Sequence, residues 1–210
     1  MQIETAIFLI IALVFSVVIH EVSHGFMANY LGDPTARVAG RLTLNPLKHL
    51  DMFGSVLLPG LLVLTSSPFL FGYAKPVPYN PYNLRNQKWG EALVAFAGPG
   101  VNILIALFFA LLVRTGAGFL PPAFIDLSVL VVYINILLAI VNLIPIPQLD
   151  GSKVIEPFLP GVLGSVYRSA RTALEQNGLI AFGFLILIIY LFGGPLFTFI
   201  RTLALTLIGA

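Results

Sequence analysis

The chain has 210 residues, of which 58% are hydrophobic and only 10% are charged, and its formal net charge is +2. Soluble domains carry about 25% charged residues, so this composition excludes an ordinary water-soluble domain. The near balance of 11 basic and 9 acidic residues provides no broad basic surface for nucleic acid. The expected partners are therefore the lipid bilayer and other membrane proteins, and not nucleic acid.

Long apolar segments predict an all-α protein that crosses the membrane several times. A spanning helix needs about 20 mostly apolar residues, and residues 3–31, 91–113 and 127–145 meet this requirement. Residues 53–71 are also long enough, but their prolines argue against one straight helix. Residues 179–208 are interrupted by Gly-Gly-Pro and could form one kinked span or two half-length helices. We expect a single membrane-embedded domain over residues 1–210, built as a bundle of about four to six membrane segments.

The connecting segments carry most of the positive charge and two short extended pieces. Nine of the eleven Lys and Arg lie in residues 32–52, 72–90 and 151–178, which the positive-inside rule places in the cytoplasm. Within these segments, residues 38–44 and 72–78 are rich in Gly, Pro and β-branched residues. We expect them to form a small membrane-associated β or re-entrant region.

A cluster of ionisable residues lies inside the first apolar segment. Residues 20–24 read HEVSH, so His20 and His24 are four residues apart and share one face of a helix, with Glu21 beside them. This is the H-E-x-x-H pattern of zinc hydrolases, in which the Glu is the general base. A polar pair that only links two helices is the alternative, but ionisable groups in membrane helices are costly and favour a functional role.

A third ligand is required, because catalytic zinc usually has three protein ligands and one open position. Cysteine is absent, so the ligand must be another His, an Asp, a Glu or an Asn. Asp150 ends the apolar segment that begins near residue 127, and Pro145 and Pro147 stop the helix so that Asp150 can point inward. The alternative is that Asp150 is only an acid at the water interface.

These two motifs together resemble the site-2 protease family of intramembrane zinc metalloproteases. The resemblance covers nearly the whole chain and includes residues 142–151 (NLIPIPQLDG), 98–102 (GPGVN), 40–46 (GRLTLNP) and 72–78 (GYAKPVP). It is to the short form of that family, which has neither PDZ nor CBS domains. The resemblance implies a multi-pass protein of a prokaryotic cell membrane, with its active site toward the cytoplasm and single-span membrane proteins as substrates.

The resemblance also implies roles for individual residues. His20, His24 and Asp150 would hold Zn²⁺, Glu21 would deprotonate water, and Asn142 would assist near the scissile carbonyl. An Asn142 that only contacts a neighbouring helix is nearly as well supported. An unwound substrate could add to an exposed strand edge, for which the candidates are residues 38–44 and 72–78, although a simple interfacial loop is the alternative. Within the second piece, the substrate-binding candidates are Gly72, Tyr73, Ala74, Lys75 and Pro76. Asn102 is a further substrate-binding candidate, with a structural role between helices as the favoured alternative.

The direction of the helices constrains the topology. His24 and Asp150 both lie toward the C-terminal ends of their segments, so one ion can join them only if these segments run in the same direction. The spans near 91–113 and 127–145 already supply two crossings, so residues 53–71 should enter the membrane and return, turning near Pro59 and Gly60.

Two other functions remain open at this stage. The buried His, Asp and Glu could serve a transporter or channel, or the chain could be a non-catalytic relative that binds membrane proteins without cutting them. The concentration of polar residues in one hydrolase-like cluster argues against the first, and retention of all the candidate catalytic groups argues against the second. His49, the remaining histidine, is expected to have a structural or interfacial role rather than to bind a second ion with Asp51.

Overall fold

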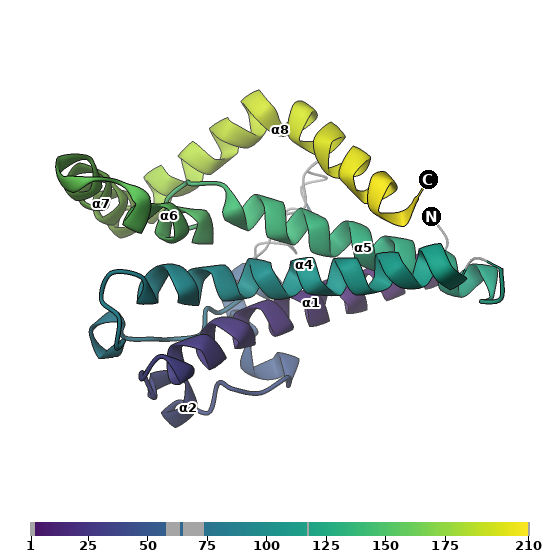
Figure 1. Cartoon of the computed structure of the whole chain (residues 1–210), viewed down its shortest axis with the longest axis horizontal. Coiled ribbons are helices and arrows are strands. Elements are labelled where there is room, and N and C mark those ends of the chain that lie inside the picture. The colour runs from purple at the N-terminus through teal and green to yellow at the C-terminus, as the bar shows by residue number, and fades with distance from the viewer. Residues whose placement is uncertain (1–2, 58–63, 65–73, 117, 210) are drawn as a thin grey trace.

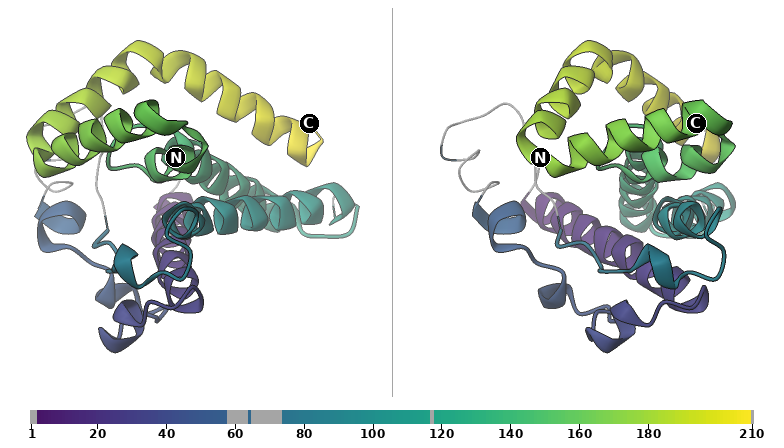
Figure 2. Two further views of the ribbon diagram at one scale, coloured as in Figure 1. Left: turned by 60° about the vertical axis from the view of Figure 1, so that its left-hand side comes forward. Right: turned by 90° about the vertical axis from the view of Figure 1, so that its left-hand side faces the viewer.

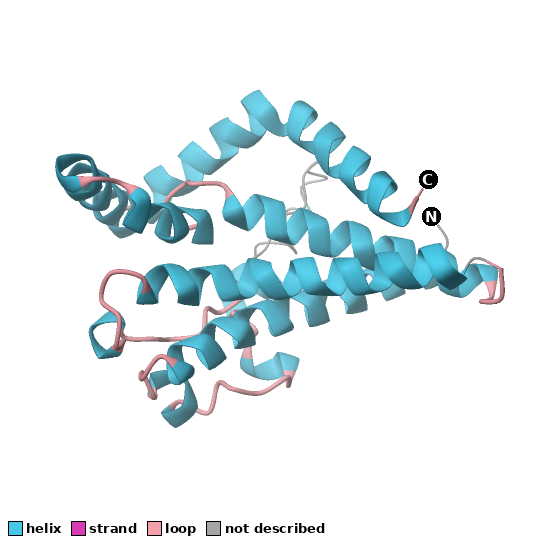
Figure 3. Ribbon diagram, in the orientation of Figure 1, coloured by secondary structure: helices cyan, strands magenta, loops and turns pink. Residues whose placement is uncertain are grey.

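The computed structural model describes residues 3–57, 64, 74–116 and 118–209. In this part of the chain the regular structure is helical, and no strand occurs (Figure 3). The four long helices are α1 (Ile3–Tyr30), α4 (Gly90–Gly116), α5 (Pro122–Leu143) and α8 (Gly178–Ile208). The whole of α1, α4 and α5, and α8 from Tyr190 onward, are long and apolar enough to cross a membrane. The prediction of a polytopic helical membrane protein is confirmed.

The long helices alternate in direction. In Figure 1, α1 and α5 run one way while α4 and α8 run the other, so that both chain termini lie at the same end of the bundle. The opposite end, called here the α6 end, carries α2 (Thr35–Val38), α6 (Asp150–Ile155) and α7 (Gly161–Gln176). The predicted parallel orientation of α1 and α5, which the shared metal site requires, is therefore present.

Small residues allow the helices to pack closely. The core between α4, α5 and α8 contains Ala106, Ala110, Val132, Ile200 and Ala204, all almost completely buried. Alanine at such interfaces lets helix backbones approach and gain dispersion contacts, which drive association in lipid. Larger apolar side chains of the same helices point outward, as lipid-facing residues should.

Helix α8 settles the arrangement of residues 179–208. The chain there forms one helix, Gly178–Ile208, with Pro195 inside it. The helix bends near its middle (Figures 1 and 2), where the proline ring removes a backbone hydrogen bond and clashes with the preceding turn. Of the two arrangements that the sequence left open, the single kinked helix is the one observed.

The predicted extended piece at 38–44 is not a strand. Val38 ends the helical turn α2, and Gly40 has a left-handed backbone (φ 63°) that turns the chain. Arg41, which is buried, then donates from Nη2 to the carbonyl of Lys75 at 2.8 Å instead of entering a ladder. A strand needs a neighbouring strand to satisfy its backbone, and this loop is held by a side chain instead.

The described residues on either side of positions 58–73 contact each other. On the N-terminal side they form the short 3₁₀ helix η1 (Pro46–Lys48) and the π-helical turn η2 (Met52–Leu57). The amide of Lys75 donates to the carbonyl of His49 at 2.8 Å, so the two flanks are in contact. This agrees with a segment that makes no net crossing. The predicted turn near residues 59–60 lies outside the described residues.

An ion-pair network joins α7 to the bundle. Arg171 of α7 is buried and contacts Glu91 at the start of α4 (Nη1–Oε1, 3.3 Å) and Glu156 of the 3₁₀ turn η4 (Glu156–Phe158; Nη2–Oε2, 3.0 Å). The apolar residues Val162 and Val166 lie on the other face of α7 and are exposed. This helix therefore attaches to the protein through its polar face.

Candidate metal centre

Helix α1 presents the H-E-x-x-H side chains deep inside the bundle. His20 and His24 are buried, and their rings meet edge to face with centroids 4.7 Å apart. Glu21 is half-buried, and ligand atoms of all three side chains lie within 4.8 Å of one another. At 1.5 Å per residue, His20 lies about 15 Å along α1 from its last residue, well within the membrane-spanning part.

Each imidazole is oriented by a hydrogen bond from its inner nitrogen. His24 Nδ1 donates to the carbonyl of Val94 at 2.7 Å, and His20 Nδ1 donates to Asn102 Oδ1 at 2.6 Å. Both acceptors lie on α4. With the proton on Nδ1, each Nε2 carries a free lone pair, which is the form that ligates a metal.

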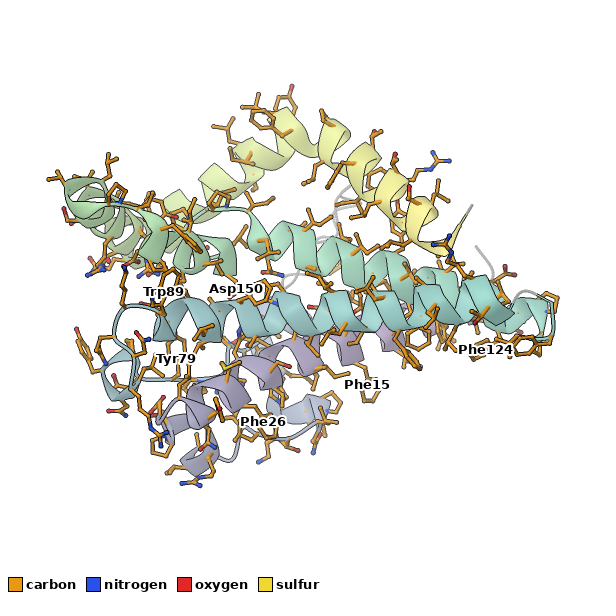
Figure 4. The ribbon with its side chains drawn as sticks, viewed as in Figure 1. Phe15, Phe26, Tyr79, Trp89, Phe124 and Asp150 are labelled. Carbon is orange, nitrogen blue, oxygen red and sulfur yellow. The ribbon has the colours of Figure 1, made fainter. Side chains whose placement is uncertain are left out.

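Asp150 reaches the two imidazoles because the chain folds back sharply after α5. Helix α5 ends at Leu143, where Pro145 and Pro147 follow, and Gln148 adopts a left-handed backbone (φ 77°). Such a backbone is unfavourable for a residue other than glycine and persists only where the surroundings enforce it. The turn starts α6 at Asp150, which Figure 4 shows between α6 and α4.

Gly151 makes this fold-back possible. A Cβ at this position would lie 2.2 Å from the carbonyl oxygen of Leu143 and 2.6 Å from that of Ile144. Backbone atoms cannot yield at these distances, so only glycine allows the start of α6 to rest on the end of α5. The Asp-Gly pair in the sequence thus combines a candidate ligand with the residue that positions it.

The three candidate ligand atoms converge at metal-binding distances. Asp150 Oδ2 lies 3.1 Å from His20 Nε2 and 3.4 Å from His24 Nε2. In a tetrahedral site with metal–ligand distances of about 2.0–2.1 Å, ligand atoms are separated by about 3.3 Å. Two neutral imidazoles and one carboxylate also match the ligand types that zinc accepts. The residues present therefore fit a zinc ion.

Gly98 borders the converging ligand atoms. A Cβ added there would lie 2.5 Å from His24 Nε2 and 2.6 Å from His20 Nε2. In the sequence, Gly98 stands out only as part of the 98–102 match to the family. In the structure its missing side chain leaves the space in which the two ligand nitrogens lie.

The loop that follows residue 73 is fastened against Glu21. The amide of Val77 donates to Glu21 Oε2 at 3.1 Å, and Arg41 Nη2 donates to the carbonyl of Lys75. Val77 itself is buried against α1 at Gly25, where a Cβ would approach its side chain to 2.7 Å. The general-base candidate is thus oriented by the same segment that the sequence marked for substrate binding.

Asp33 fixes the far end of this loop. Its carboxylate accepts hydrogen bonds from the amides of Thr35 and Asn80, from the Thr35 hydroxyl and from Asn83 Nδ2, at distances between 2.6 and 3.2 Å. Burial alone would raise the pKa of Asp33, but these hydrogen bonds outweigh it and hold the pKa below its ordinary value. The loop over Glu21 is therefore anchored to the end of α1 by an ionised carboxylate.

Asn142, residues 74–76 and His49 have contacts of their own. Asn142 Nδ2 donates to the carbonyl of Leu138 in its own helix at 2.9 Å, and in the described part of the chain no hydrogen bond joins it to the cluster. Ala74, Lys75 and Pro76 belong to an irregular segment, while residues 72–73 lie outside the described residues. His49 is buried, and its Nε2 contacts the carbonyl of Thr43 at 2.8 Å, consistent with the structural role expected for it.

Two contacts of the site could not be recognised from motifs alone. The sequence offered Asn102 as a substrate contact or a helix-packing residue, whereas the structure places it against His20. Asn135, which the sequence analysis did not single out, contacts Asn102 at 2.7 Å. An amide inside a strongly apolar helix is costly, and this signal would have marked Asn135 for attention.

Comparison with known proteins assigns the family. The family described as "Peptidase family M50" matches residues 8–125 and 122–190, a region that contains every candidate ligand. The chain belongs to peptidase family M50. The resemblance to site-2 proteases that the motifs indicated is thereby confirmed.

Relatives of this M50 chain carry names that describe them as zinc metalloproteases. The chain is 36% identical over 183 residues to "Putative zinc metalloprotease YwhC" of Bacillus subtilis, covering 83% of this chain and 78% of the relative. It is 31% identical over 147 residues to "Putative zinc metalloprotease Rip2" of Mycolicibacterium smegmatis and 32% identical over 155 residues to that of Mycobacterium tuberculosis H37Rv. The chain spans 54% of the length of each of these two mycobacterial relatives. No solved structure matches the chain.

Proposed function

We propose that this M50 chain is a zinc-dependent endopeptidase that cleaves other membrane proteins within or next to the bilayer. The observation that carries the proposal is the convergence of His20 Nε2, His24 Nε2 and Asp150 Oδ2 within 3.1–3.4 Å contacts, inside an apolar helix bundle. The names of the relatives independently support zinc as the metal. Neither the family nor the relatives support the transporter or channel alternative.

His20, His24 and Asp150 would hold the ion. Zinc in such a site acts as a Lewis acid and lowers the pKa of water toward neutrality. Glu21 would receive the proton of the attacking water and deliver it to the amide nitrogen of the leaving group. The hydrogen bond from Val77 holds one oxygen of the Glu21 carboxylate and leaves the other available for this transfer.

The segment from residue 74 supports binding of an unwound substrate. Peptide bonds in a membrane helix are protected by their own hydrogen bonds, so the substrate must be locally extended before cleavage. Pro76 and Pro78 restrict the backbone of this segment toward extended conformations, and Arg41 and Glu21 fix it through the Lys75 carbonyl and the Val77 amide. We propose that Ala74, Lys75 and Pro76 contact the substrate together with Gly72 and Tyr73, and that substrates are single-span proteins whose helices unwind easily. Asn142 is retained in this proposal as a neutral donor near the scissile carbonyl.

Cleavage that depends on zinc is the direct test. The purified chain in liposomes, mixed with a single-span substrate that has Gly or Asn in its membrane helix, should release two fragments. A zinc chelator should abolish the release, and added Zn²⁺ should restore it. Fragment release that is undiminished after the metal has been removed, as verified by elemental analysis, would contradict the proposal.

The site is proposed to open toward the cytoplasm. Nine of the eleven Lys and Arg belong to the connecting segments of the α6 end, where the metal site lies, and the positive-inside rule places this end in the cytoplasm. Because the chain has no native cysteine, single cysteines can report on each side. Cysteines at Lys48 and Lys88 should be protected from an impermeant thiol reagent in intact cells, whereas one at Thr115 should react. The reverse pattern would place the site outside.

A further inference from the structure

A chain of buried polar side chains leads away from His20 across three helices. His20 Nδ1 contacts Asn102 Oδ1 at 2.6 Å, Asn102 Nδ2 contacts Asn135 Oδ1 at 2.7 Å, and Asn135 Nδ2 contacts Ser16 Oγ at 3.0 Å. Asn102 and Asn135 are both 0% exposed. Four polar groups in the centre of a membrane bundle would destabilise it unless each is hydrogen-bonded, and here each has a partner.

Backbone carbonyls determine which groups donate and which accept in this series of hydrogen bonds. The Nδ2 group of Asn135 also donates to the carbonyl of Val131 at 2.9 Å, and a carbonyl can only accept. Asn135 must therefore turn its amide nitrogen toward Val131 and its oxygen toward Asn102. Asn102 must in turn offer its nitrogen to Asn135, a choice reinforced by the carbonyl of Ser16 at 3.5 Å, and its oxygen to His20.

The two histidines differ in how their inner nitrogens are fixed. His24 Nδ1 faces the carbonyl of Val94, which is part of the α4 backbone and cannot become a donor. His20 Nδ1 faces a side-chain amide, which would offer a donor instead of an acceptor if it rotated by half a turn. The orientation of His20 therefore depends on whatever prevents Asn102 from rotating.

We infer that Asn135 is a positioning residue for the metal site: it locks the Asn102 amide so that His20 carries its proton on Nδ1 and directs the lone pair of Nε2 toward His24 and Asp150. This inference rests on the proposed zinc site. It gives Asn135 of α5 a role in metal binding although its hydrogen bonds go to Asn102, Ser16 and Val131 and not to a candidate ligand. Partners that orient a ligand histidine typically contribute 10- to 100-fold to metal affinity.

Substitutions at residue 135 separate this role from packing. Asn135→Leu keeps the approximate size of the side chain and removes its acceptor, which leaves only the 3.5 Å contact with the Ser16 carbonyl to hold the Asn102 amide. Asn135→Asp keeps an acceptor for Asn102 Nδ2 in either protonation state. Ser128→Ala serves as the control, because Ser128 is another buried polar residue of α5 that lies outside the chain of contacts. Elution as a single folded species is required of each variant.

Two measurements follow the imidazoles directly. Nuclear magnetic resonance of the protein labelled with ¹⁵N-histidine shows which ring nitrogens carry a proton, and with three histidines in the chain the signals can be assigned by single substitutions. Competition with a chelator of known affinity gives the zinc dissociation constant. The spectrum is recorded with and without zinc, so it tests the orientation of His20 even if no zinc binds.

The wild-type protein should show His20 protonated on Nδ1 in both spectra. Asn135→Leu should disturb this signal, leave that of His24 in place and weaken zinc binding by about 10- to 100-fold. Asn135→Asp and Ser128→Ala should resemble wild type. An unprotonated Nδ1 of His20 in the wild type would overturn the inference, as would wild-type zinc affinity in Asn135→Leu or equal losses of affinity in the Leu and Asp variants. Failure of the wild type to bind zinc would instead contradict the proposed function.

Discussion

Replacing Glu21 with Gln should reduce the rate of substrate cleavage by about 10²- to 10⁴-fold, the usual contribution of a general base. Gln has the same shape as Glu, and its amide oxygen can still accept the hydrogen bond from the Val77 amide, so the loop over the site should remain in place. His20 and His24 are untouched, so zinc should be retained. The expected result is a folded, zinc-loaded and inactive protein.

The matched control is Glu4→Gln, the same substitution in the first turn of the same helix, where Glu4 is exposed. This variant should cleave at the wild-type rate. Both variants are assayed in liposomes with the same substrate, and their zinc content is measured by elemental analysis. Cleavage by Glu21→Gln at an undiminished rate would remove Glu21 from the mechanism, and loss of its zinc would make Glu21 a structural support of the site instead.

A single methyl group at residue 98 should be almost as damaging. In Gly98→Ala the new Cβ would lie 2.5–2.6 Å from the ligand nitrogens of His24 and His20, closer than unbonded heavy atoms can approach. The imidazoles must shift by several tenths of an ångström, and a misplacement of this kind costs about 100-fold in rate when it reaches about 1 Å. We expect zinc affinity and cleavage to fall together.

Gly100→Ala provides the comparison for this effect. Gly100 lies on the same helix, but the nearest side chain to a Cβ there would be the ring of Phe96, at 3.3 Å, and not a histidine. The two variants therefore have equal helix propensity and differ in what the methyl group contacts. Zinc affinities measured by chelator competition should separate them, and equal affinities would show that Gly98 does not border the metal.

The sequence was sufficient for the parts of the site that depend on local spacing. Two histidines four residues apart must share a helix face, and this holds wherever the helix packs. Asp150 was inferred from its position after an apolar segment, and the structure brings its carboxylate to both imidazoles. The requirement that α1 and α5 run in the same direction followed from these residues together.

The contacts of Asn102 could not be derived in the same way. Whether Asn102 faces a substrate, a helix or His20 depends on how far α4 is rotated about its axis relative to α1, and no local pattern determines that rotation. The role of Gly98 depends on the same rotation. The β structure expected near residues 38–44 is not observed for a related reason, because the described backbone there is held by the Arg41 side chain rather than by a second strand.

The central claim is that residues 130 positions apart in the sequence hold one zinc ion. It is tested most directly by zinc X-ray absorption spectroscopy and zinc content of the wild type, Asp150→Ala and Asp126→Ala. Wild type and Asp126→Ala should bind one zinc ion with two imidazoles and oxygen ligands at about 2.0–2.2 Å, whereas Asp150→Ala should lose most of its zinc. Equal zinc content and an unchanged spectrum in Asp150→Ala, or three imidazole ligands in the wild type, would contradict the account.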